Sequence, residues 1–449
     1  MIATELKDKI PRGPVFILTH LNAAGYETYL VGGCVRDLLM GVEPHDWDIT
    51  TNATPEQVKE VFSNLQVLDT GLKHGTVTLL LSKEPFEITT FRVDGDYSDG
   101  RHPDSVRFAA SLEEDLSRRD FSINAIAIDK AGNLKDPFRG AEDVRRKVIR
   151  CVGDPHARFR EDGLRILRAL RFASRLGFHI DADTERAIHI DRTRLSKVSA
   201  ERIQKELMGI LMGESVYRVL TQFPDVMSQF IPELAPCVNF QQNTPWHCYD
   251  VYGHIAASVD AALADPILRL TMLFHDIGKP QCCEVGKDGW RHFHGHAAVS
   301  AKIAEKRLRA LRFDNETIEV VTQLVSVHDT LMEPNKKSVL RMVNKLGGYE
   351  RFTQFLQVRE ADIRAQSRLD FNARMRKVGT LHMLAAEAKR AQDAFRLKDL
   401  AVNGNDLLEL GFDPGPELGQ ILHRMLDAVI DGNLSNSKES LLAFAKAQK

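Results

Sequence analysis

Hydrophobic and polar positions follow two different patterns along the chain, and the change falls near Cys151. Before it, short alternating apolar runs predict strands, separated by helices such as TPEQVKEVFSNL, where Thr54 is a capping residue and Pro55 lies in the first turn. After it, the strand signal nearly disappears and apolar residues recur about every 3.6 positions. We therefore expect an α+β protein, with a small α/β domain followed by helices.

The first 150 residues carry all the strand candidates. A helix over residues 5–25 precedes them and ends at Gly25. The expected strands are residues 29–33, 47–51, 77–81, 86–93 and 123–129. These elements predict a mixed sheet.

Composition limits the class of protein. With 449 residues, 43% of them hydrophobic, the chain can form several domains with cores of their own. No apolar run approaches the roughly 20 residues of a membrane helix, and the first residues lack the core of a secretory signal. The six cysteines show no metal-finger spacing. We expect a cytoplasmic protein without membrane contact; nothing in the sequence specifies an oligomeric state.

The net charge is only −2, but positive charge is concentrated locally. Residues 139–175 contain eleven Lys or Arg against five Asp or Glu, and residues 351–399 contain eleven against six. Basic stretches inside a neutral chain are typical of phosphate-binding surfaces, although solvated helix faces look similar.

Two motifs in the first domain suit nucleotide chemistry. Gly32 and Gly33 follow an apolar strand, so that backbone N–H groups can approach a triphosphate that Arg36 would neutralise. Asp46 and Asp48 are two residues apart, and on a strand both carboxylates would point to one face. Paired carboxylates suit Mg²⁺ bound together with substrate phosphates, and Glu87 is a candidate third carboxylate.

Three further motifs follow in order: RRDFSINA at residues 118–125, DPFRG at 136–140 and EDGLRILRALRF at 161–172. The ordered set resembles the class II tRNA nucleotidyltransferases and the bacterial poly(A) polymerases. This resemblance implies a polymerase-β-like palm in which Asp46 and Asp48 are catalytic metal ligands. It also implies that Gly33, Arg36, Arg119 and Asp120 bind the nucleotide.

The resemblance further implies that Asp162 and Arg165 select the base. Three residues apart on an expected helix, they share a face. A carboxylate only accepts hydrogen bonds and a guanidinium only donates them, so the pair fits the amino and ring-nitrogen edge of cytosine or adenine. Uracil and guanine present the opposite order. Arg168 and Arg171 continue the stripe toward phosphate or base.

A loop between Arg92 and Arg107 is rich in glycine and aspartate. It resembles the loop that family members need to change from C to A addition, and its Asp99-Gly100-Arg101 favours a chain competent to add A. A surface loop without this role is the alternative.

The helical half contains a second motif. His254 and the doublet His275-Asp276 resemble the HD phosphohydrolase superfamily, whose metal ligands are His, His-Asp and a distant Asp. Asp362 is our first choice for the distant ligand and Asp329 the second, while His296 and His328 would complete a second metal position. Such a domain can also serve as an RNA-binding scaffold without hydrolysis.

The expected division is a nucleotidyltransferase palm at 1–150, a base-selecting neck and body at 151–240, an HD-type domain at 241–370 and an RNA-binding tail at 371–449. The predicted reaction adds C, C and A to the tRNA 3′ end from CTP and ATP with Mg²⁺ and no template. An A-adding enzyme and a poly(A) polymerase remain alternatives. So does a metal-dependent phosphohydrolase whose palm binds RNA.

Overall fold

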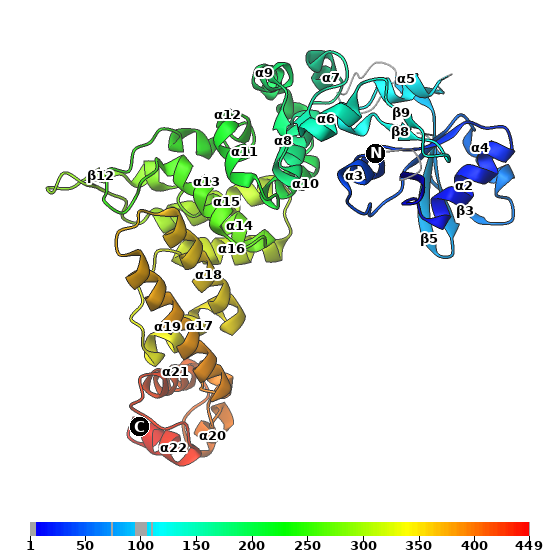
Figure 1. Ribbon diagram of the computed structural model, residues 1–449. Coiled ribbons are helices and arrows are strands. Elements are labelled where there is room, and N and C mark those ends of the chain that lie inside the picture. The colour runs from blue at the N-terminus through cyan, green and yellow to red at the C-terminus, as the bar shows by residue number, and fades with distance from the viewer. Residues whose placement is uncertain (1–5, 73–74, 95–105, 109–110, 449) are drawn as a thin grey trace. The chain divides into compact units, whose positions relative to one another are not determined.

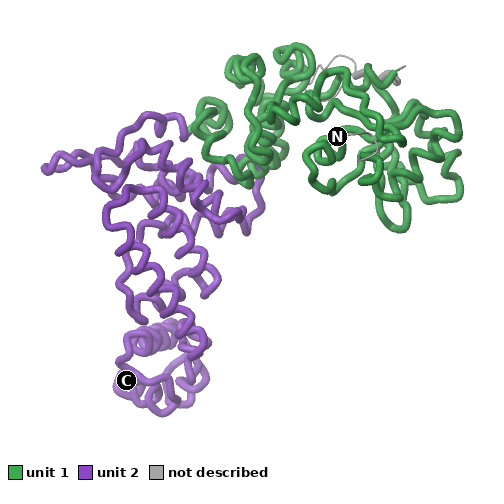
Figure 2. The backbone as a smooth tube through the Cα atoms, in the orientation of Figure 1, with its two compact units in different colours: residues 1–232 green, residues 233–449 purple. Residues whose placement is uncertain are grey.

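The computed structural model describes residues 6–72, 75–94, 106–108 and 111–448. Two compact units divide the chain, Met1–Pro232 and Glu233–Lys449 (Figure 2). We call them unit 1 and unit 2. None of the described helices is long and apolar enough to cross a bilayer. The finer division into four domains stays a prediction.

Unit 1 begins with a mixed sheet, as expected. Within the described residues the sheet has seven strands in the order β3-β4-β5-β2-β1-β8-β9. Their bounds are β1 Thr28–Val31, β2 Ile49–Thr51, β3 Gln66–Gly71, β4 Thr76–Leu81, β5 Glu84–Thr90, β8 Ala127–Ile128 and β9 Leu134–Lys135. The β2–β5 pair is parallel, and the other pairs of this sheet are antiparallel. Figure 1 shows this sheet beside its helices in blue and cyan.

Short helices cover the sheet and lead into the site. Helix α2 (Arg12–Ala23) packs against β1 and against α4 (Pro55–Val61), which Thr54 caps through a reciprocal capping box with Gln57. Helix α3 (Gly33–Met40) follows β1 directly, and Gly32 makes the turn with a positive φ of 84°. The glycine pair therefore lies between a strand and a helix, as its motif predicts.

Two of the expected strands begin later than predicted. Strand β2 begins at Ile49, so Asp46 and Asp48 lie in the loop before it rather than on a strand. The run 123–129 starts as a 3₁₀ turn, η2 (Ser122–Asn124), before β8 begins. Side-chain hydrogen bonds favour this 3₁₀ turn over a strand: inside the protein, Ser122 donates to Asp143 at 2.5 Å and Asn124 donates to Asp120 at 3.4 Å.

A strand pair stands where the glycine-rich loop begins and ends. Strand β6 (Arg92–Asp94) pairs antiparallel with β7 (Val106–Phe108). The two ends of the expected loop are therefore paired strands. Asp99-Gly100-Arg101 lie outside the described residues.

The rest of unit 1 is helical. Its helices are α5 Leu112–Ser117, α6 Gly140–Arg146, α7 Pro155–Glu161, α8 Leu164–Leu176, α9 Ala182–Asp191, α10 Ala200–Leu211, α11 Val216–Gln222 and α12 Pro224–Met227. Helix α8 packs along α10 and buries one apolar side, which includes Ile166 and Leu170. One strand pair, β10 (Val148–Ile149) with β11 (His179–Ile180), departs from the all-helical expectation.

Up to residue 448, where the description ends, unit 2 is helical except for one short hairpin, β12 (Glu284–Val285) with β13 (Arg291–His292). Its helices are α13 Val251–Ala261, α14 Pro266–Phe274, α15 His296–Ala310, α16 Asn315–Val327, α17 Lys336–Leu346, α18 Tyr349–Ala365, α19 Phe371–Arg390, α20 Gly404–Glu409, α21 Pro416–Ile430 and α22 Lys438–Lys446. A continuous apolar core extends from α16 to α22 and includes Phe352, Phe355 and Met425. Helices α13, α14, α15, α16 and α18 pack against one another around a polar cluster described below.

Candidate functional site

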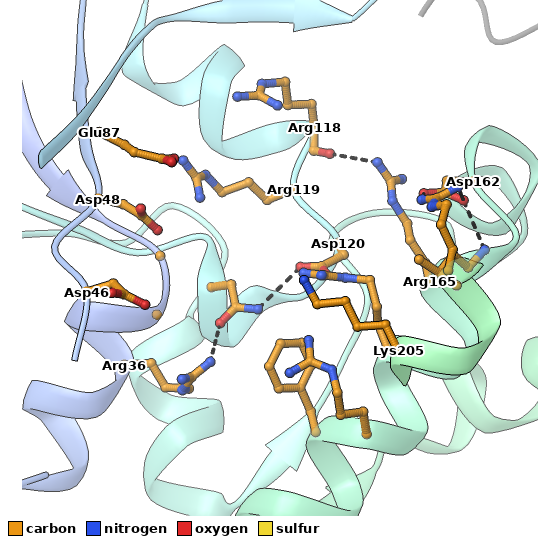
Figure 3. Close-up of a pocket in the computed structure, with 18 residues that line it drawn as sticks. Arg36, Asp46, Asp48, Glu87, Arg118, Arg119, Asp120, Asp162, Arg165 and Lys205 are labelled. Carbon is orange, nitrogen blue, oxygen red and sulfur yellow. Dashed lines mark hydrogen bonds and ion pairs between the residues drawn. The ribbon is translucent and has the colours of Figure 1, made fainter. Parts of the chain in front are cut away.

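One cavity of about 840 Å³ in unit 1 brings together every site residue predicted for this half of the chain (Figure 3). These residues are Gly33, Arg36, Asp46, Asp48, Arg119, Asp120, Asp162, Arg165, Arg168 and Arg171. Glu87 also lines the cavity. Side chains more than a hundred residues apart therefore face one space.

Three carboxylates lie on one side of the cavity. Asp46 and Asp48 precede β2, and Glu87 lies on β5, which pairs with β2 in parallel (Figure 3). Withdrawal from solvent raises the pKa of Asp48; Arg119 opposes this shift, and the charges of Glu87 and Asp46 add to it. Mutual repulsion of this kind favours a bound cation. A Cβ at Gly32 would lie 3.2 Å from Arg119 and 3.6 Å from Asp48, so glycine keeps this approach open.

A chain of hydrogen bonds crosses the floor of the cavity. Arg36 donates to Asn124 at 2.8 Å, Asn124 donates to Asp120 at 3.4 Å, and Arg168 donates to the other Asp120 oxygen at 2.7 Å. Burial alone would raise the pKa of Asp120, but the guanidinium groups of Arg168 and Arg165 outweigh it and hold the pKa below its usual value. Asp120 is therefore an ionised anchor for the arginines, and Asn124 connects it to Arg36.

Asp115 is a residue that the sequence did not indicate. It is fully buried and accepts from Arg118 at 2.8 Å and from Arg119 at 3.4 Å. These ion pairs hold the pKa of Asp115 below its usual value although burial opposes them. Its position on α5, one turn before two arginines, was the available signal.

The helix predicted to carry Asp162 and Arg165 is broken between them, so they do not share one helix face. Asp162 ends α7 in an extended conformation, and Arg165 lies in the first turn of α8. A Cβ at Gly163 would lie 3.0 Å from the backbone oxygen of Arg194, so glycine leaves room for this close approach at the break. Both side chains still line the same cavity.

Each of these two side chains has its own partners. Asp162 accepts from Arg202 of α10 at 2.6 Å, and its other oxygen accepts from the backbone N–H of Leu164 at 3.0 Å. Arg165 donates to Glu161 and, at 3.2 Å, to the backbone oxygen of Arg118. The acceptor and the donor are therefore held apart rather than paired with each other. Arg202 and Glu161 had no assigned role from sequence.

Arginines surround one aromatic ring beside the cavity. The guanidinium carbons of Arg36, Arg168 and Arg171 lie 5.4, 5.6 and 4.4 Å from the ring centre of Phe172. Arg171 also pairs with Glu206 of α10 at 2.6 Å. Lys205 lines the cavity as well. Because α10 reaches the site only through its packing on α8, no local motif could have identified its residues.

Unit 2 contains a second polar cluster, and it includes the four residues predicted there. His254 of α13, His275 and Asp276 after α14, and Asp362 of α18 are all buried. The His254 Nε2 atom lies 3.2 Å from Asp276 and 3.2 Å from Asp362. His254, His275 and Asp276 form a group with the spacing to hold a metal ion. Nitrogen and carboxylate donors together suit a divalent transition metal or Mg²⁺.

Of the other residues predicted for this cluster, His296 and His328 belong to it and Asp329 lies at its edge. His296 and His328 form a second potential metal-holding group with the same Asp276. Asp329 is nearly half-exposed, and its nearest cluster contact is 3.9 Å from His296 Nδ1. Asp362 is therefore the distant carboxylate that the fold brings in, and Asp329 is not. Lys279, three residues after Asp276, lies 2.6 Å from it.

Three family models match the chain. "Poly A polymerase head domain" matches residues 28–150, "Probable RNA and SrmB- binding site of polymerase A" residues 177–237, and "tRNA nucleotidyltransferase domain 2 putative" residues 283–445.

Relatives match over nearly full length. The chain is 34% identical over 451 residues to the CCA-adding enzyme of Enterococcus faecalis, covering 100% of this chain and 97% of that one. It is 32% identical over 440 residues to the CCA-adding enzyme of Lactobacillus helveticus, covering 97% of each. A crystal structure of the Bacillus stearothermophilus CCA-adding enzyme in complex with CTP is similar with a TM-score of 0.70 and 31% identity, covering 97% of this chain and 96% of that one. The chain belongs to the CCA-adding enzymes, the class II tRNA nucleotidyltransferases that its ordered motifs resemble.

Proposed function

We propose that the cavity of unit 1 adds C, C and A to the 3′ end of tRNA, taking CTP and ATP and releasing pyrophosphate. One observation carries this: a single cavity contains both the carboxylates suited to a metal–triphosphate complex and an acceptor–donor pair suited to a base. The Bacillus stearothermophilus relative was solved with CTP. A nucleic-acid template is not needed, because the base is read by protein side chains.

Nucleotidyltransferases of this type use divalent metal ions, and we assign Mg²⁺ to Asp46 and Asp48. The fit rests on three carboxylates in the same corner of the cavity, where the charges of Glu87 and Asp46 add to the raised pKa of Asp48. When bound, the ions supply charge neutralisation and a lower pKa for the attacking 3′-hydroxyl. Glu87, on the neighbouring strand β5, would add a further negative charge beside Asp46 and Asp48.

The arginines position the triphosphate. Arg36 and Arg119 both line the cavity beside the glycine turn, and we expect them to present donors to phosphate oxygens. Asp115 orients Arg119, and Asp120 orients Arg168. The backbone N–H of Gly33 can approach the phosphates because no Cβ intervenes, whereas that of Gly32 donates to the backbone oxygen of Ile126 at 3.2 Å. The leaving pyrophosphate would be held by the same groups.

Base selection falls to Asp162 and Arg165. Cytosine and adenine each present an amino donor beside a ring-nitrogen acceptor, which match a carboxylate and a guanidinium. UTP and GTP would place a carbonyl against the carboxylate and an N–H against the guanidinium. Two unmet groups at about 1–3 kcal/mol each reject these bases by roughly a hundredfold or more. Arg202 and Glu161 hold the two readers in place.

The tRNA acceptor end is the second substrate. The chain has basic stretches but no overall positive charge. This suits recognition of the RNA by its phosphates and its shape rather than by its base sequence. We assign these contacts to the helices after the palm, including the basic segment 351–399. The glycine-rich loop keeps its proposed role in A addition.

Unit 2 holds a second divalent ion in our proposal, with His254, His275, Asp276 and Asp362 as ligands. The observation that favours it is the inward convergence of buried imidazole and carboxylate groups from three elements. Without a cation, four polar groups would be buried mainly against one another. This ion is separate from the nucleotide-transfer site.

The test is incorporation into tRNA transcripts that end before CCA, after C and after CC. CTP and ATP are offered singly and together, with UTP and GTP as controls. We expect C, C and one A, followed by termination. Addition of A alone to the CC-ended transcript would identify an A-adding enzyme, and a long A tail a poly(A) polymerase. No incorporation on any transcript contradicts the proposal.

A further inference from the structure

Three guanidinium groups surround the ring of Phe172, and they differ in how much of their hydrogen-bonding capacity is already used. Arg36 contacts protein oxygens through all three of its guanidinium nitrogens, and Arg168 does so through two. Among the residues that the structure describes, the guanidinium of Arg171 has one acceptor, Oε2 of Glu206, which Nε reaches at 2.6 Å. Arg171 is therefore the least committed of the three.

The unused donors of Arg171 lie on its two terminal nitrogens. A guanidinium carries five N–H groups in a planar fork, and in the described part of the chain the Nε group alone is bound. Arg171 lines the cavity, and 20% of its side chain is exposed. The terminal N–H groups are therefore available to an anion that enters the cavity.

Helix α10 provides a slot for the side chain of Arg171. A Cβ at Gly209 would lie 2.3 Å from Cδ of Arg171 and 2.8 Å from its Cγ, closer than non-bonded carbon atoms approach. The φ of Gly209 is not positive, so the backbone itself would accept an alanine. The space that this glycine leaves is occupied by the arginine.

Glu206 lies three residues before Gly209, on the same face of α10. Its side chain is buried against Arg171. Its charge also reaches a second arginine: Asp120 raises the pKa of Arg168 most, and Glu206 adds to that shift. The glycine and the acid together fix the stem and the head of Arg171.

The two helices approach closely again about one turn later. A Cβ at Gly213, just beyond α10, would lie 2.1 Å from Oγ of Ser174 on α8. Ser174 donates to the backbone oxygen of Ile210 at 2.7 Å. Contacts at two levels therefore hold α8 against α10, and they keep Glu206 beside Arg171.

The position of Arg171 favours a phosphate ligand over a base. Its guanidinium carbon and that of Arg36 lie 4.4 and 5.4 Å from the same ring centre. Arg36 lies on α3, directly after the glycine turn at which we place the triphosphate. Like charges this close repel each other, and a bound polyanion offsets the repulsion.

We propose that Glu206 and Gly209 are positioning residues that hold Arg171 for the triphosphate of the incoming nucleotide. The proposal rests on nucleotide addition in the cavity of unit 1, which is the proposed function. Gly209 admits the stem of Arg171, Glu206 binds its Nε, and the terminal nitrogens donate to phosphate oxygens. Pyrophosphate, which has no base or sugar, is therefore the simplest probe of this contact.

The first experiment displaces Arg171 without changing any charge. Pyrophosphate and CTP are titrated into the full-length chain with Mg²⁺ in a calorimeter. We expect Gly209→Ala to raise both dissociation constants by roughly tenfold, as for the loss of a charge-assisted contact. Gly419→Ala, in α21 with open space around the added methyl group, is the matched control and should bind as the parent does. Since alanine favours a helix over glycine, a weaker helix would not account for the loss.

A double variant shows whether Gly209 acts through Arg171. Arg171→Ala should weaken pyrophosphate binding by roughly tenfold, and Gly209→Ala added to it should change little further. Equal binding by the parent and Gly209→Ala, or a full further loss in the double variant, would overturn the positioning role. Unchanged pyrophosphate binding with a raised KM for the tRNA transcript would place Arg171 on the RNA, which also overturns the proposal.

Glu206→Ala separates position from charge. Removal of the acid leaves more positive charge in the cavity, and this alone would tighten pyrophosphate binding. Loss of the bond to Arg171 weakens it, and we expect the dissociation constant to rise roughly threefold. Tighter or unchanged binding would overturn the role of Glu206.

The binding measurements and the proposed function can fail separately. A parent chain that binds pyrophosphate but adds no nucleotide contradicts the proposed function, and the binding comparison still decides the positioning role. A parent chain that adds C, C and A, with all variants equal to it in binding, contradicts the positioning role alone. A parent chain that binds neither CTP nor pyrophosphate overturns both.

Discussion

In the cavity of unit 1, arginines outnumber carboxylates. Two of these arginines are fixed by buried acids: Arg118 donates to Asp115 and Arg168 to Asp120. In the cluster of unit 2, buried imidazoles and carboxylates face one another across distances near 3 Å. The first arrangement lines a large cavity with guanidinium groups, which suits the anionic substrate that we propose. The second brings nitrogen and oxygen atoms together at spacings that could hold small cations. The two units therefore bury their carboxylates differently: unit 1 pairs Asp115 and Asp120 with arginines, whereas unit 2 packs Asp276 against imidazoles.

The largest expected effect concerns the carboxylates in the cavity of unit 1. Asp48→Asn should lower nucleotide incorporation by roughly 1,000-fold, equivalent to about 4 kcal/mol of transition-state stabilisation. The amide keeps the size of the carboxylate and removes the charge that we assign to metal binding. Incorporation of CTP and ATP into transcripts is the measurement.

The matched control for Asp48→Asn is Asp427→Asn, on an exposed position of α21. It makes the same chemical change far along the chain and should leave incorporation unaltered. Metal retention by unit 2 should be the same in both variants. Incorporation by Asp48→Asn within tenfold of the parent would remove Asp48 from the metal site.

The second effect concerns a buried charge beneath the cavity. Asp115→Asn should destabilise the protein by about 3–5 kcal/mol, because Arg118 and Arg119 would lose a fully buried partner. The pKa of Asp115 lies below its ordinary value of 3.8, so its contribution is complete above that pH. It is lost as the pH falls toward the lower value of the folded state.

Urea unfolding at pH 7 and near pH 3 measures this pH dependence. The difference in unfolding free energy between parent and Asp115→Asn should be large at pH 7 and smaller under acid. Asp427→Asn again serves as the control. A difference that does not depend on pH would show that Asp115 acts through packing rather than charge.

The third effect tests metal retention. At a free Mn²⁺ concentration a hundred times the dissociation constant, a site that exists only in the folded state adds about 2.7 kcal/mol of stability. We expect the melting temperature of the chain with Asp46→Asn and Asp48→Asn to rise with Mn²⁺. The same rise should be absent after His254→Ala. A rise that persists without His254 would place the metal elsewhere.

The sequence predicted the fold class, and the family resemblance it carries is confirmed by relatives over nearly full length. Local patterns located β1, β2, β4, β5 and β8 and the helical character of the later chain, but they missed β3 and β9 of the sheet. They failed where tertiary contacts decide the backbone. Glu161 to Phe172 has the periodicity of one helix, yet Asp162 is extended and α8 begins only at Leu164.

The site residues also fall into those with a local sequence signal and those that only the fold brings to the site. Motif residues such as Asp46, Asp120 and Asp162 carried their own local signal, and the fold gathers them in one cavity. Arg202 and Lys205 carried none, because α10 reaches the cavity only by packing against α8. In unit 2, the doublet His275-Asp276 was visible, but the sharing of Asp276 between two histidine pairs depends on where α15 and α16 pack.

The smallest effect concerns a residue that acts through another. Arg202 donates to both oxygens of Asp162, at 2.6 and 3.3 Å, and thereby fixes the acceptor that we assign to base reading. Arg202→Ala should reduce the preference for CTP over UTP by roughly tenfold, about 1.4 kcal/mol, because a freer carboxylate tolerates the wrong base better. The rate with CTP should fall less than the selectivity.

The control for Arg202→Ala is Arg186→Ala, since Arg186 pairs with Asp183 on the exposed surface of the same unit. An exposed pair contributes little, so this variant should behave as the parent. The decisive readout is the ratio of kcat/KM for CTP to that for UTP on one transcript. A purely structural role for Arg202 would lower both values together and leave the ratio unchanged. Recovery of the ratio in Arg202→Lys would show that the positive charge alone positions Asp162, and failure to recover would show that the two-point contact is required.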